Sequence, residues 1–322
     1  MSIKENVLKK LIESATFISG QELAESLNVS RNAIWKAVKS LESDGYIIDA
    51  VNNKGYRLNN KYKILSAEEI KIHLKTQEYG RNIIVLDEID STNNYARTLA
   101  VDGAENGTAV ISECQTAGKG RMGRSFFSPK GTGLYVSLII RPDMDILSAQ
   151  LITSCTAVAV AEAIEQLCGA EVKIKWVNDL FLNGRKICGI LTEASMNFEE
   201  KKLAYAVIGI GINIRTSENT PCELKNIMTS IEEETGKTID RNALCGEVIN
   251  SLERHILNIE SREFMDEYRR RSFIFGKQVE IAKNGKLMQG TATGIDDNAN
   301  LIVKLDDGSE VTVNSGEARI IK

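Results

Sequence analysis

Apolar side chains recur at three- and four-residue spacing in three successive stretches near the start of the chain, which predicts three helices. These helices cover residues 7–12, 23–27 and 30–43. Asn28 can end the second helix, Ser30 can cap the third, and Gly45 can end the third. The runs 46–48 and 56–58 then flank a turn rich in Asn, Lys and Gly, which predicts a β-hairpin.

This order of elements is typical of a winged helix-turn-helix, which we expect in residues 1–62. The segment 1–60 has eight basic and seven acidic residues, so its net charge is only slightly positive. The third helix nevertheless has a polar face that includes Trp35 and is basic overall. We predict DNA contacts from the polar members of this face, Arg31, Asn32, Lys36 and Lys39. The alternative is a small helical interaction domain with a solvated charged face.

The pattern changes to alternating strands and helices between residues 65 and 270. The predicted strands are 83–86, 108–111, 134–140, 172–176, 186–193 and 205–213. The predicted helices are 93–101, 148–167 and 241–259. We therefore expect a mixed α/β domain built on one large sheet.

Residues 272–322 lose the helical period and alternate over short runs. The predicted strands are 279–281, 288–295, 301–305 and 310–313, with turns rich in Asp, Asn and Gly between them. This pattern predicts a small SH3-like β-barrel.

Composition narrows the class of protein. The chain has 322 residues, 43% apolar and 26% charged, and a net charge of −4, so DNA binding would need a local basic surface. Six cysteines lie far apart and there are only two histidines, which argues against a zinc site and a disulfide framework. We expect no signal peptide and no membrane span, and hence a cytoplasmic protein.

The densest candidate for chemistry is the run Gly118-Lys119-Gly120-Arg121-Met122-Gly123-Arg124, which holds three glycines and three cations. Glycines let a backbone approach a ligand closely, and amides with cations favour an anion. The letters also fit the G-x-G-x-x-G of dinucleotide folds, but residues 125–133 are aromatic and turn-forming rather than helical. We therefore predict a phosphate clamp on a sheet, with a solvated basic loop as the alternative.

Four further segments are candidates, each with a simpler alternative. Residues 91–93 can cap a helix or offer polar groups to a ligand. Residues 175–179 can form a turn or a polar strand end, and 185–191 bring a lysine to the mouth of an apolar strand, where it needs an anion or solvent. Residues 209–213 alternate glycine with isoleucine, which suits close approach of a ligand or of a packed helix.

The chain lacks the patterns of other mechanisms. Neither histidine has a Ser-His-Asp or Cys-His context, and no G-x-x-x-x-G-K-[ST] loop is present. Positioning and charge stabilisation therefore fit better than covalent catalysis.

Taken together, these motifs resemble those of the bifunctional biotin protein ligases that also repress the biotin operon. Residues 118–129 resemble the family's G-R-G-R-x-G-R-x-W-x-S-P loop, 175–179 resemble K-W-P-N-D, and 185–191 resemble R-K-x-x-G-I-L. Lys119 stands where Arg is frequent, Phe126 where many members have Trp, and Val177 where Pro is usual. The resemblance covers nearly the whole chain and its domain order.

The resemblance implies that biotin and ATP, with Mg²⁺, give biotinyl-5′-AMP, and that biotin then passes to a lysine of a biotin carboxyl carrier domain. The catalytic residues it implies are Lys186, Arg121 and Asp179, where Asp179 could orient Lys186 or hold Mg²⁺. The implied biotin-binding residues are Ser91, Thr92, Asn93, Gln115, Gly118, Lys119, Gly120, Arg121, Lys186 and Gly189. The implied adenylate-binding residues are Arg124, Phe126, Asn178 and Asn213.

The implied partners are the carrier domain of biotin-dependent carboxylases, operator DNA, and a second copy of the chain once the adenylate is bound. No membrane partner is expected. The alternatives are a lipoate-type acyl-protein ligase, a ligase with a non-functional DNA-binding domain, and a biotin-sensing repressor without ligase activity.

Overall fold

The chain forms two compact units in a computed structural model. One unit holds Met1–Leu74 and Asp240–Gly246, and the other holds Lys75–Ile239 and Glu247–Lys322. The structure describes residues 2–14, 16–43, 46, 48–51, 54–58, 64–145, 149–197, 199, 202–217, 219–283 and 286–321. The division into domains 1–62, 65–270 and 272–322 stays a prediction.

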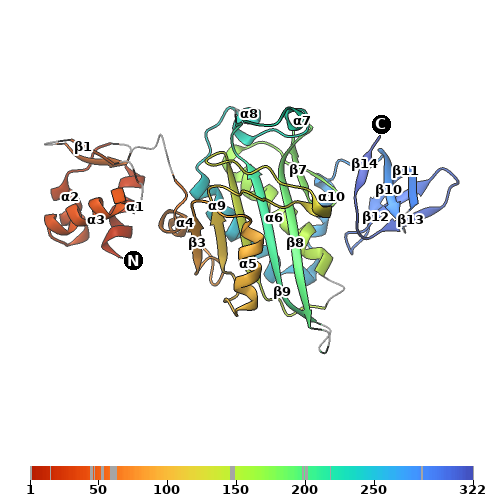
Figure 1. Cartoon of the computed structure of the whole chain (residues 1–322), viewed down its shortest axis with the longest axis horizontal. Helices are drawn as coiled ribbons and strands as arrows, with labels where there is room; N and C mark the ends of the chain where they lie inside the picture. Colours follow the sequence, from red (N-terminus) through yellow and green to blue (C-terminus); the bar gives the residue numbers. More distant parts are fainter. Residues whose placement is uncertain are drawn as a thin grey trace. The chain divides into compact units, whose positions relative to one another are not determined.

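The first unit begins with three helices and a hairpin, as predicted (Figure 1). The elements are α1 (Ile3–Glu13), α2 (Gly20–Leu27), α3 (Arg31–Ser43), β1 (Ile48–Val51) and β2 (Gly55–Leu58). Asn28 ends α2 in the left-handed conformation, with φ 52°. The Ser30 hydroxyl accepts from the Ala33 amide at 3.2 Å and caps α3. Gly45, predicted to end α3, lies outside the described residues.

The helical stripes predicted from the sequence form the core of this unit. Val7, Leu8, Leu11, Leu23, Ile34, Val38 and Leu41 are among its buried residues. The first strand of the hairpin was predicted to begin at Tyr46, but β1 begins at Ile48, and Ile47 is not described. The helix α4 (Ala67–His73) was not predicted, because its short acidic sequence has little apolar periodicity.

The second unit is built on a seven-stranded mixed sheet in the order β3-β4-β5-β9-β8-β7-β6. The strands are β3 (Ile83–Leu86), β4 (Ala109–Ser112), β5 (Gly133–Ile140), β6 (Lys173–Lys175), β7 (Asp179–Leu182), β8 (Arg185–Asn197) and β9 (Lys202–Asn213). Only β3 and β4 pair in parallel. The prediction of one large sheet is confirmed, but β7 was missed.

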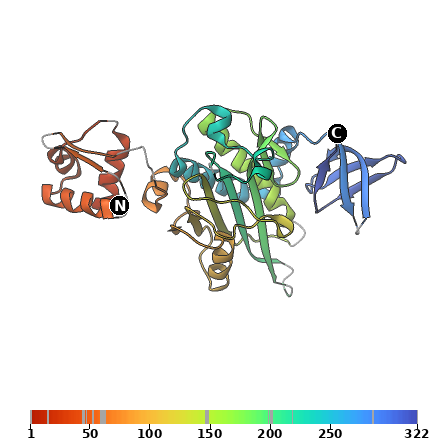
Figure 2. The same ribbon diagram turned by 45° about the horizontal axis from the view of Figure 1, so that its top comes forward.

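Helices pack on both faces of this sheet (Figures 1 and 2). One face carries α5 (Thr92–Val101), which packs its Ala96 and Ala100 against Val110, Ile139 and Val207. The other carries α6 (Ala149–Cys168), whose Thr153 bonds to Thr192 of β8. Since Gly209 and Gly211 lie on the α5 face, Ile208, Ile210 and Ile212 alternate toward α6.

The helix α6 is long and apolar enough to span a membrane by composition alone. However, 72% of its most apolar window is buried within the protein. It is therefore a core helix, as the sequence predicts.

Shorter helices complete the chain before the last sheet. They are α7 (Cys222–Lys225), α8 (Ile231–Thr235), α9 (Arg241–Leu257) and α10 (Phe264–Arg271). Of these, only α9 was predicted, because the other three are too short to show a clear apolar period.

The C-terminal segment forms a five-stranded antiparallel sheet in the order β13-β12-β11-β10-β14 (Figure 2). Its strands are β10 (Gln278–Lys283), β11 (Lys286–Ile295), β12 (Leu301–Leu305), β13 (Glu310–Val313) and β14 (Ala318–Ile320). Four of these strands were predicted. The three-residue β14 was not.

Candidate functional site

A small cavity of about 60 Å³ lies on the α5 face of the central sheet. Nine of the ten residues predicted to bind biotin line it: Ser91, Thr92, Asn93, Gln115, Lys119, Gly120, Arg121, Lys186 and Gly189. All but Gln115, which only the family resemblance implied, come from segments that the sequence singled out. The tenth, Gly118, lies beside the cavity: a Cβ on Gly118 would meet the Phe126 carbonyl at 2.5 Å and Ser128 Oγ at 2.7 Å. The structure therefore brings these segments together at one place.

One side of the cavity is a network of hydroxyl and amide groups. Gln115 Oε1 accepts from the Thr92 amide at 2.9 Å and from the Thr92 hydroxyl at 3.0 Å. The Ser137 hydroxyl lies 2.8 Å from Thr92 Oγ1 and 2.6 Å from Asn93 Oδ1. Asn93 Nδ2 donates to Glu193 at 2.8 Å. Because each group holds the next, these donors and acceptors have fixed directions.

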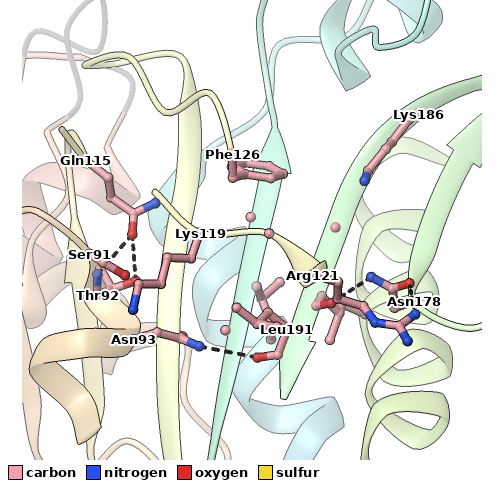
Figure 3. A pocket seen from close by; sticks show the side chains of 16 residues that line it. Ser91, Thr92, Asn93, Gln115, Lys119, Arg121, Phe126, Asn178, Lys186 and Leu191 are labelled. Atoms are coloured by element: carbon pink, nitrogen blue, oxygen red, sulfur yellow. Dashed lines mark hydrogen bonds between the residues drawn. The ribbon is translucent and has the colours of Figure 1, made fainter. Parts of the chain in front are cut away.

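Ser91 lies at the N-cap position of α5 and is only 1% exposed, yet its hydroxyl makes no capping hydrogen bond. Ser91 is therefore the N-cap residue of α5, as the sequence allowed, but its hydroxyl does not serve the cap. Figure 3 shows Ser91, Thr92, Asn93 and Gln115 on one side of the cavity, and Lys186, Arg121 and Asn178 on the other.

Glycines on β8 and β9 leave room for side chains that line the cavity. A Cβ on Gly209 would lie 2.2 Å from Asn93 Oδ1, and one on Gly211 would lie 2.4 Å from the Phe126 ring. A Cβ on Gly189 would meet Lys186 Nζ and Phe126 at 3.2 Å. The close approach proposed for residues 209–213 is thus made by polar and aromatic side chains of the site, and not by the alanine-rich α6.

The glycine-rich loop lies across the cavity as a short 3₁₀ turn at Arg121–Gly123. It does not open an α-helix, which agrees with the rejection of a dinucleotide-type turn. Lys119 Nζ donates to Asn94 Oδ1 at 2.5 Å, and Arg121 donates to Asn178 Oδ1 at 3.0 Å. Asn178 is itself fixed, since its Nδ2 donates to the Ile190 carbonyl at 2.8 Å.

Lys186 is the second residue of β8 and its side chain lines the cavity. Its Nζ lies 2.7 Å from Asp179 Oδ1. Both side chains are about one quarter exposed. Asp179 lies outside the first cavity and lines a neighbouring one of about 100 Å³, together with Lys186, Arg121 and Arg124. Lys186 therefore lines both cavities, and Asp179, which pairs with it, lines only the second.

Charge in the first cavity has one sign. Lys119, Arg121 and Lys186 are the charged residues of its lining, and the described lining residues include no acid, histidine or cysteine. Three cations around a small cavity favour a carboxylate or a phosphate there.

The residues predicted to bind the adenylate are not all in one place. Phe126 and Asn178 line the first two cavities. Asn213 lines a third, larger cavity of about 270 Å³ with Phe127, Pro129 and Thr216. Arg124 lines the 100 Å³ cavity and forms a two-pronged ion pair with Glu317, the residue before β14. Hydrogen bonding and charge from Arg124 lower the pKa of Glu317, against a smaller opposing effect of burial.

Some lining residues were not among the predicted site residues. They are Ile190, Leu191, Gly209, Ile210 and Gly211 of the first cavity, Lys175 of the second, and Phe127, Arg185 and Arg215 of the third. Residues 209–213 had already been noted for their alternating glycines, so that signal was present in the sequence. Among the described residues, no group of three His, Cys, Asp or Glu side chains could hold a metal ion.

The residues predicted to contact DNA lie together on α3. Arg31, Asn32, Lys36 and Lys39 are all exposed, while Ile34, Val38 and Leu41 of the same helix are buried. Lys39 pairs with Glu42 at 2.6 Å.

Comparisons with known proteins give the site its context. The profile of the biotin/lipoate A/B protein ligase family matches residues 85–213, an HTH domain profile matches 4–57, and the biotin protein ligase C-terminal domain matches 274–319. The bifunctional ligase/repressor BirA of Bacillus spizizenii is 37% identical over 318 residues, which covers 95% of this chain and 96% of that protein. The chain belongs to the biotin protein ligase family.

Two further members of the biotin protein ligase family support this. The bifunctional ligase/repressor BirA of Escherichia coli K12 is 31% identical and is covered over 96% of its length by 95% of this chain. The biotin protein ligase from Aquifex aeolicus, solved in complex with biotin and ATP, is 27% identical with a TM-score of 0.64. It matches over 99% of its own chain and 75% of this one.

Proposed function

We propose that this chain joins biotin to ATP to form biotinyl-5′-AMP, transfers the biotinyl group to a lysine of a biotin carboxyl carrier domain, and represses biotin genes when the adenylate is bound. The observation that carries the ligase part is the first cavity. It has fixed amide and hydroxyl groups at one side with Lys119 beside them, the cations Arg121 and Lys186 at the other side (Figure 3), and a glycine-rich loop across it. This arrangement suits a small acid with a polar head and a carboxylate to be activated.

Biotin has such a shape. Its ureido ring offers one carbonyl and two N–H groups, which match the donors and acceptors of Thr92, Asn93 and Gln115. Its carboxylate would then point toward Lys186 and the loop amides of residues 118–121. The carboxylate is already a nucleophile, so it attacks the α-phosphate without a general base, which agrees with a lining that holds no histidine.

Lys186 stabilises the charge that builds up as the mixed anhydride forms. Its ammonium lies between the first cavity and the 100 Å³ cavity, where carboxylate and α-phosphate would meet. Asp179 holds that ammonium in place at 2.7 Å, which makes it a positioning residue. Fixed charges of this kind need no reorganisation during the reaction.

The loop must move for substrates to enter. The first cavity is far below the roughly 300–1,000 Å³ typical of small-molecule sites, and hydrogen bonds tie the loop residues Lys119 and Arg121 to Asn94 and Asn178. The loop would then close over the adenylate, where Arg121 and its amides retain it until the carrier lysine arrives.

We place the nucleoside in the 270 Å³ cavity, beside Asn213 and Phe127. Phe126 lines the first cavity against Gly211, and it would border the adenylate from that side. This assigns Phe126 and Asn213 to two sides of one ligand rather than to one shared surface.

Magnesium would come with the nucleotide. Mg²⁺ is usually held by one or two carboxylates together with substrate phosphates. The residues fit that mode, because Asp179 and Glu317 line the 100 Å³ cavity and no dedicated cluster is present among the described residues. When bound, the ion neutralises phosphate charge. The attacking carrier lysine can pass its proton to the adenylate phosphate or to Asp179.

The repressor part rests on the HTH match and on the basic face of α3. We assign the three helices and hairpin of the first unit to a winged helix-turn-helix, and the five-stranded C-terminal sheet to an SH3-like barrel. Two copies of the chain would place two α3 helices on two half-sites. A cytoplasmic location fits DNA and carrier domain as partners.

The test is an incubation of the full chain with ATP, labelled biotin and a biotin carrier domain, with lipoate as the competing acid. We expect label on one carrier lysine, with AMP and pyrophosphate as products. Formation of ADP, or preference for lipoate, would overturn the ligase proposal. A mobility shift on the chain's own biotin-gene promoter tests the repressor part: equal affinity with and without biotin plus ATP would leave a ligase with an idle DNA-binding domain.

A further inference from the structure

The exposed face of α3 carries one large apolar side chain among its polar ones. Trp35 is 50% exposed, and it lies on the same face of α3 as Arg31, Asn32, Lys36 and Lys39, since neighbours in this set are three or four residues apart along the helix. Figure 1 shows where α3 lies in the first unit. The other tryptophan of the chain, Trp176, is only 3% exposed, and its Nε1 donates to the Ala299 carbonyl at 2.9 Å.

Trp35 does not serve the core of its own unit. That core takes Ile34, Ala37, Val38 and Leu41 from α3, and Trp35 is neither among its buried residues nor among the partly buried residues that pack on it. A half-exposed indole gains little for folding and leaves apolar surface in water. Its position is better explained by a contact made outside the unit.

The surroundings of Trp35 favour DNA over a protein surface. Arg31 and Lys36 make no ion pair with any residue that the structure describes, so both can pair with phosphates. An apolar protein partner would need further apolar surface beside the indole. The other large apolar side chains exposed in the described part of residues 2–58 are Ile3 and Val51, and neither is on α3.

A lone apolar side chain between cations suits the major groove. There, cations pair with the phosphates at the edges, and a central side chain meets the base edges. The apolar feature that the bases present in this groove is the 5-methyl group of thymine. We infer that Trp35 is a specificity-determining residue that contacts thymine methyl groups of the operator, while Arg31 and Lys36 supply affinity that does not depend on sequence.

This inference rests on the proposed repressor function and adds to it the feature of the operator that the protein recognises, the thymine methyl group. The methyl group can be removed without other change, because deoxyuridine differs from thymidine only by that group. The experiment therefore combines a change in the protein with a change in the DNA. It uses the full chain with biotin and ATP, and a duplex selected by that chain from a pool of random sequence.

Each thymidine of the selected duplex is replaced in turn by deoxyuridine, and affinity is measured by mobility shift for the wild type, Trp35→Ala and Lys36→Ala. For the wild type, we expect a loss of about fourfold at one or two positions of each half-site, the factor that corresponds to about 0.8 kcal/mol for one buried methyl-sized group. Trp35→Ala should bind the thymidine and deoxyuridine duplexes equally at those positions, and its preference over unrelated DNA should fall roughly tenfold.

Lys36→Ala is the matched control on the same face. It should weaken binding to selected and unrelated duplexes alike and lower the salt slope by about one, while keeping the wild-type response to deoxyuridine. Intrinsic fluorescence gives a second readout: the duplex should quench the wild type, and this quenching should be absent in Trp35→Ala, which retains only the buried Trp176. A thermal unfolding midpoint within a few degrees of the wild type shows that Trp35→Ala is folded.

Three results would overturn the inference. The first is an equal deoxyuridine response in the wild type and Trp35→Ala. The second is unchanged DNA affinity of Trp35→Ala together with a loss of self-association, which would assign the indole to a protein contact. The third is failure of the wild type to select any duplex, which would remove the repressor function as well and is distinguishable because the first two results both require a selected duplex.

Discussion

The glycine-rich loop and α3 carry similar cations in opposite circumstances. In the loop, the exposed Lys119 bonds to Asn94 and the half-buried Arg121 bonds to Asn178, while Lys186 is held by Asp179. On α3, Arg31 and Lys36 turn outward and have no ion-pair partner among the described residues. Under the proposed function, this difference separates two uses of positive charge: held cations would stabilise one reacting group, and unpaired cations would attract a long polyanion.

Salt should separate the two regions most strongly. If two α3 helices each neutralise three phosphates, operator affinity should fall with a log–log slope near −5, or roughly 10³-fold between 50 and 200 mM salt. Adenylate formation should change only a few-fold, because the loop cations act at short range in an enclosed site that salt screens less. Mobility shift and pyrophosphate release over one salt series give both numbers. Parallel losses would show that the two sets of cations work alike.

Removal of Lys186 is the next largest effect expected. Lys186→Ala takes away the cation that faces both carboxylate and α-phosphate, so the rate of adenylate formation should fall roughly 10²-fold or more. Lys130→Ala is the matched control, since it breaks another lysine–aspartate pair, with Asp87, on an exposed surface. A Lys186→Ala rate close to that of the control would remove Lys186 from the mechanism.

A substitution at Gly209 tests whether Asn93 is held as tightly as its hydrogen bonds indicate. In Gly209→Ala, the new Cβ would lie 2.2 Å from Asn93 Oδ1, and Asn93 is held in turn by Ser137 and Glu193. We expect a rise of roughly tenfold in the Kd for biotin and a loss of ~1–3 kcal/mol of stability.

Gly294→Ala is the control for this change, because its nearest contact is an ordinary 3.6 Å to Ile302. Isothermal titration with biotin and urea unfolding measure the two effects. Wild-type biotin affinity in Gly209→Ala would mean that Asn93 can move aside freely.

The sequence predicts elements well where one face is apolar over several turns or strand positions. The three helices of the first unit, α5, α6 and the long strands β5, β8 and β9 are of this kind. The missed strand β7 is instructive, because residues 175–179 were interpreted only as a strand end with a turn. An Asn183-Gly184 pair, both with positive φ, joins β7 to β8. That dipeptide is a strong hairpin signal and could have revealed the strand.

The sequence predicted which residues form the site better than it predicted which of them are in contact. Several motif residues converge on one cavity because they lie where a strand, a helix or a loop begins or ends. Which of them touch could not be predicted, since Asn93 of α5 packs on Gly209 of β9 and Arg124 meets Glu317 near the end of the chain. Such contacts depend on how separate elements pack, which no local pattern records. Arg124 was therefore predicted to bind the adenylate, and its ion pair with Glu317 was not predicted.

The smallest expected effect is the loss of stability when the ion pair of Arg124 is removed. It bears on the comparison of the loop with α3, because Arg124 belongs to the loop but is exposed like the cations of α3. Its side chain is 65% exposed, and that of Glu317 is 41% exposed. Glu317→Gln should therefore cost only ~0.5 kcal/mol of stability or less at pH 7. Arg124 lowers the pKa of Glu317 below its unfolded value, so the contribution is present above about pH 4.3 and is lost as pH falls through the folded-state pKa.

Urea unfolding of the wild type and Glu317→Gln between pH 3.5 and 7 measures this contribution. The two stabilities should differ slightly at pH 7 and converge below about pH 4. Glu310→Gln is the control, since Glu310 is an exposed carboxylate of the C-terminal sheet. High salt should also remove the difference, as it would for a pair on α3. A difference of several kcal/mol, or one that persists at low pH, would place Arg124 with the held cations of the cavity and not with the solvated cations of the surface.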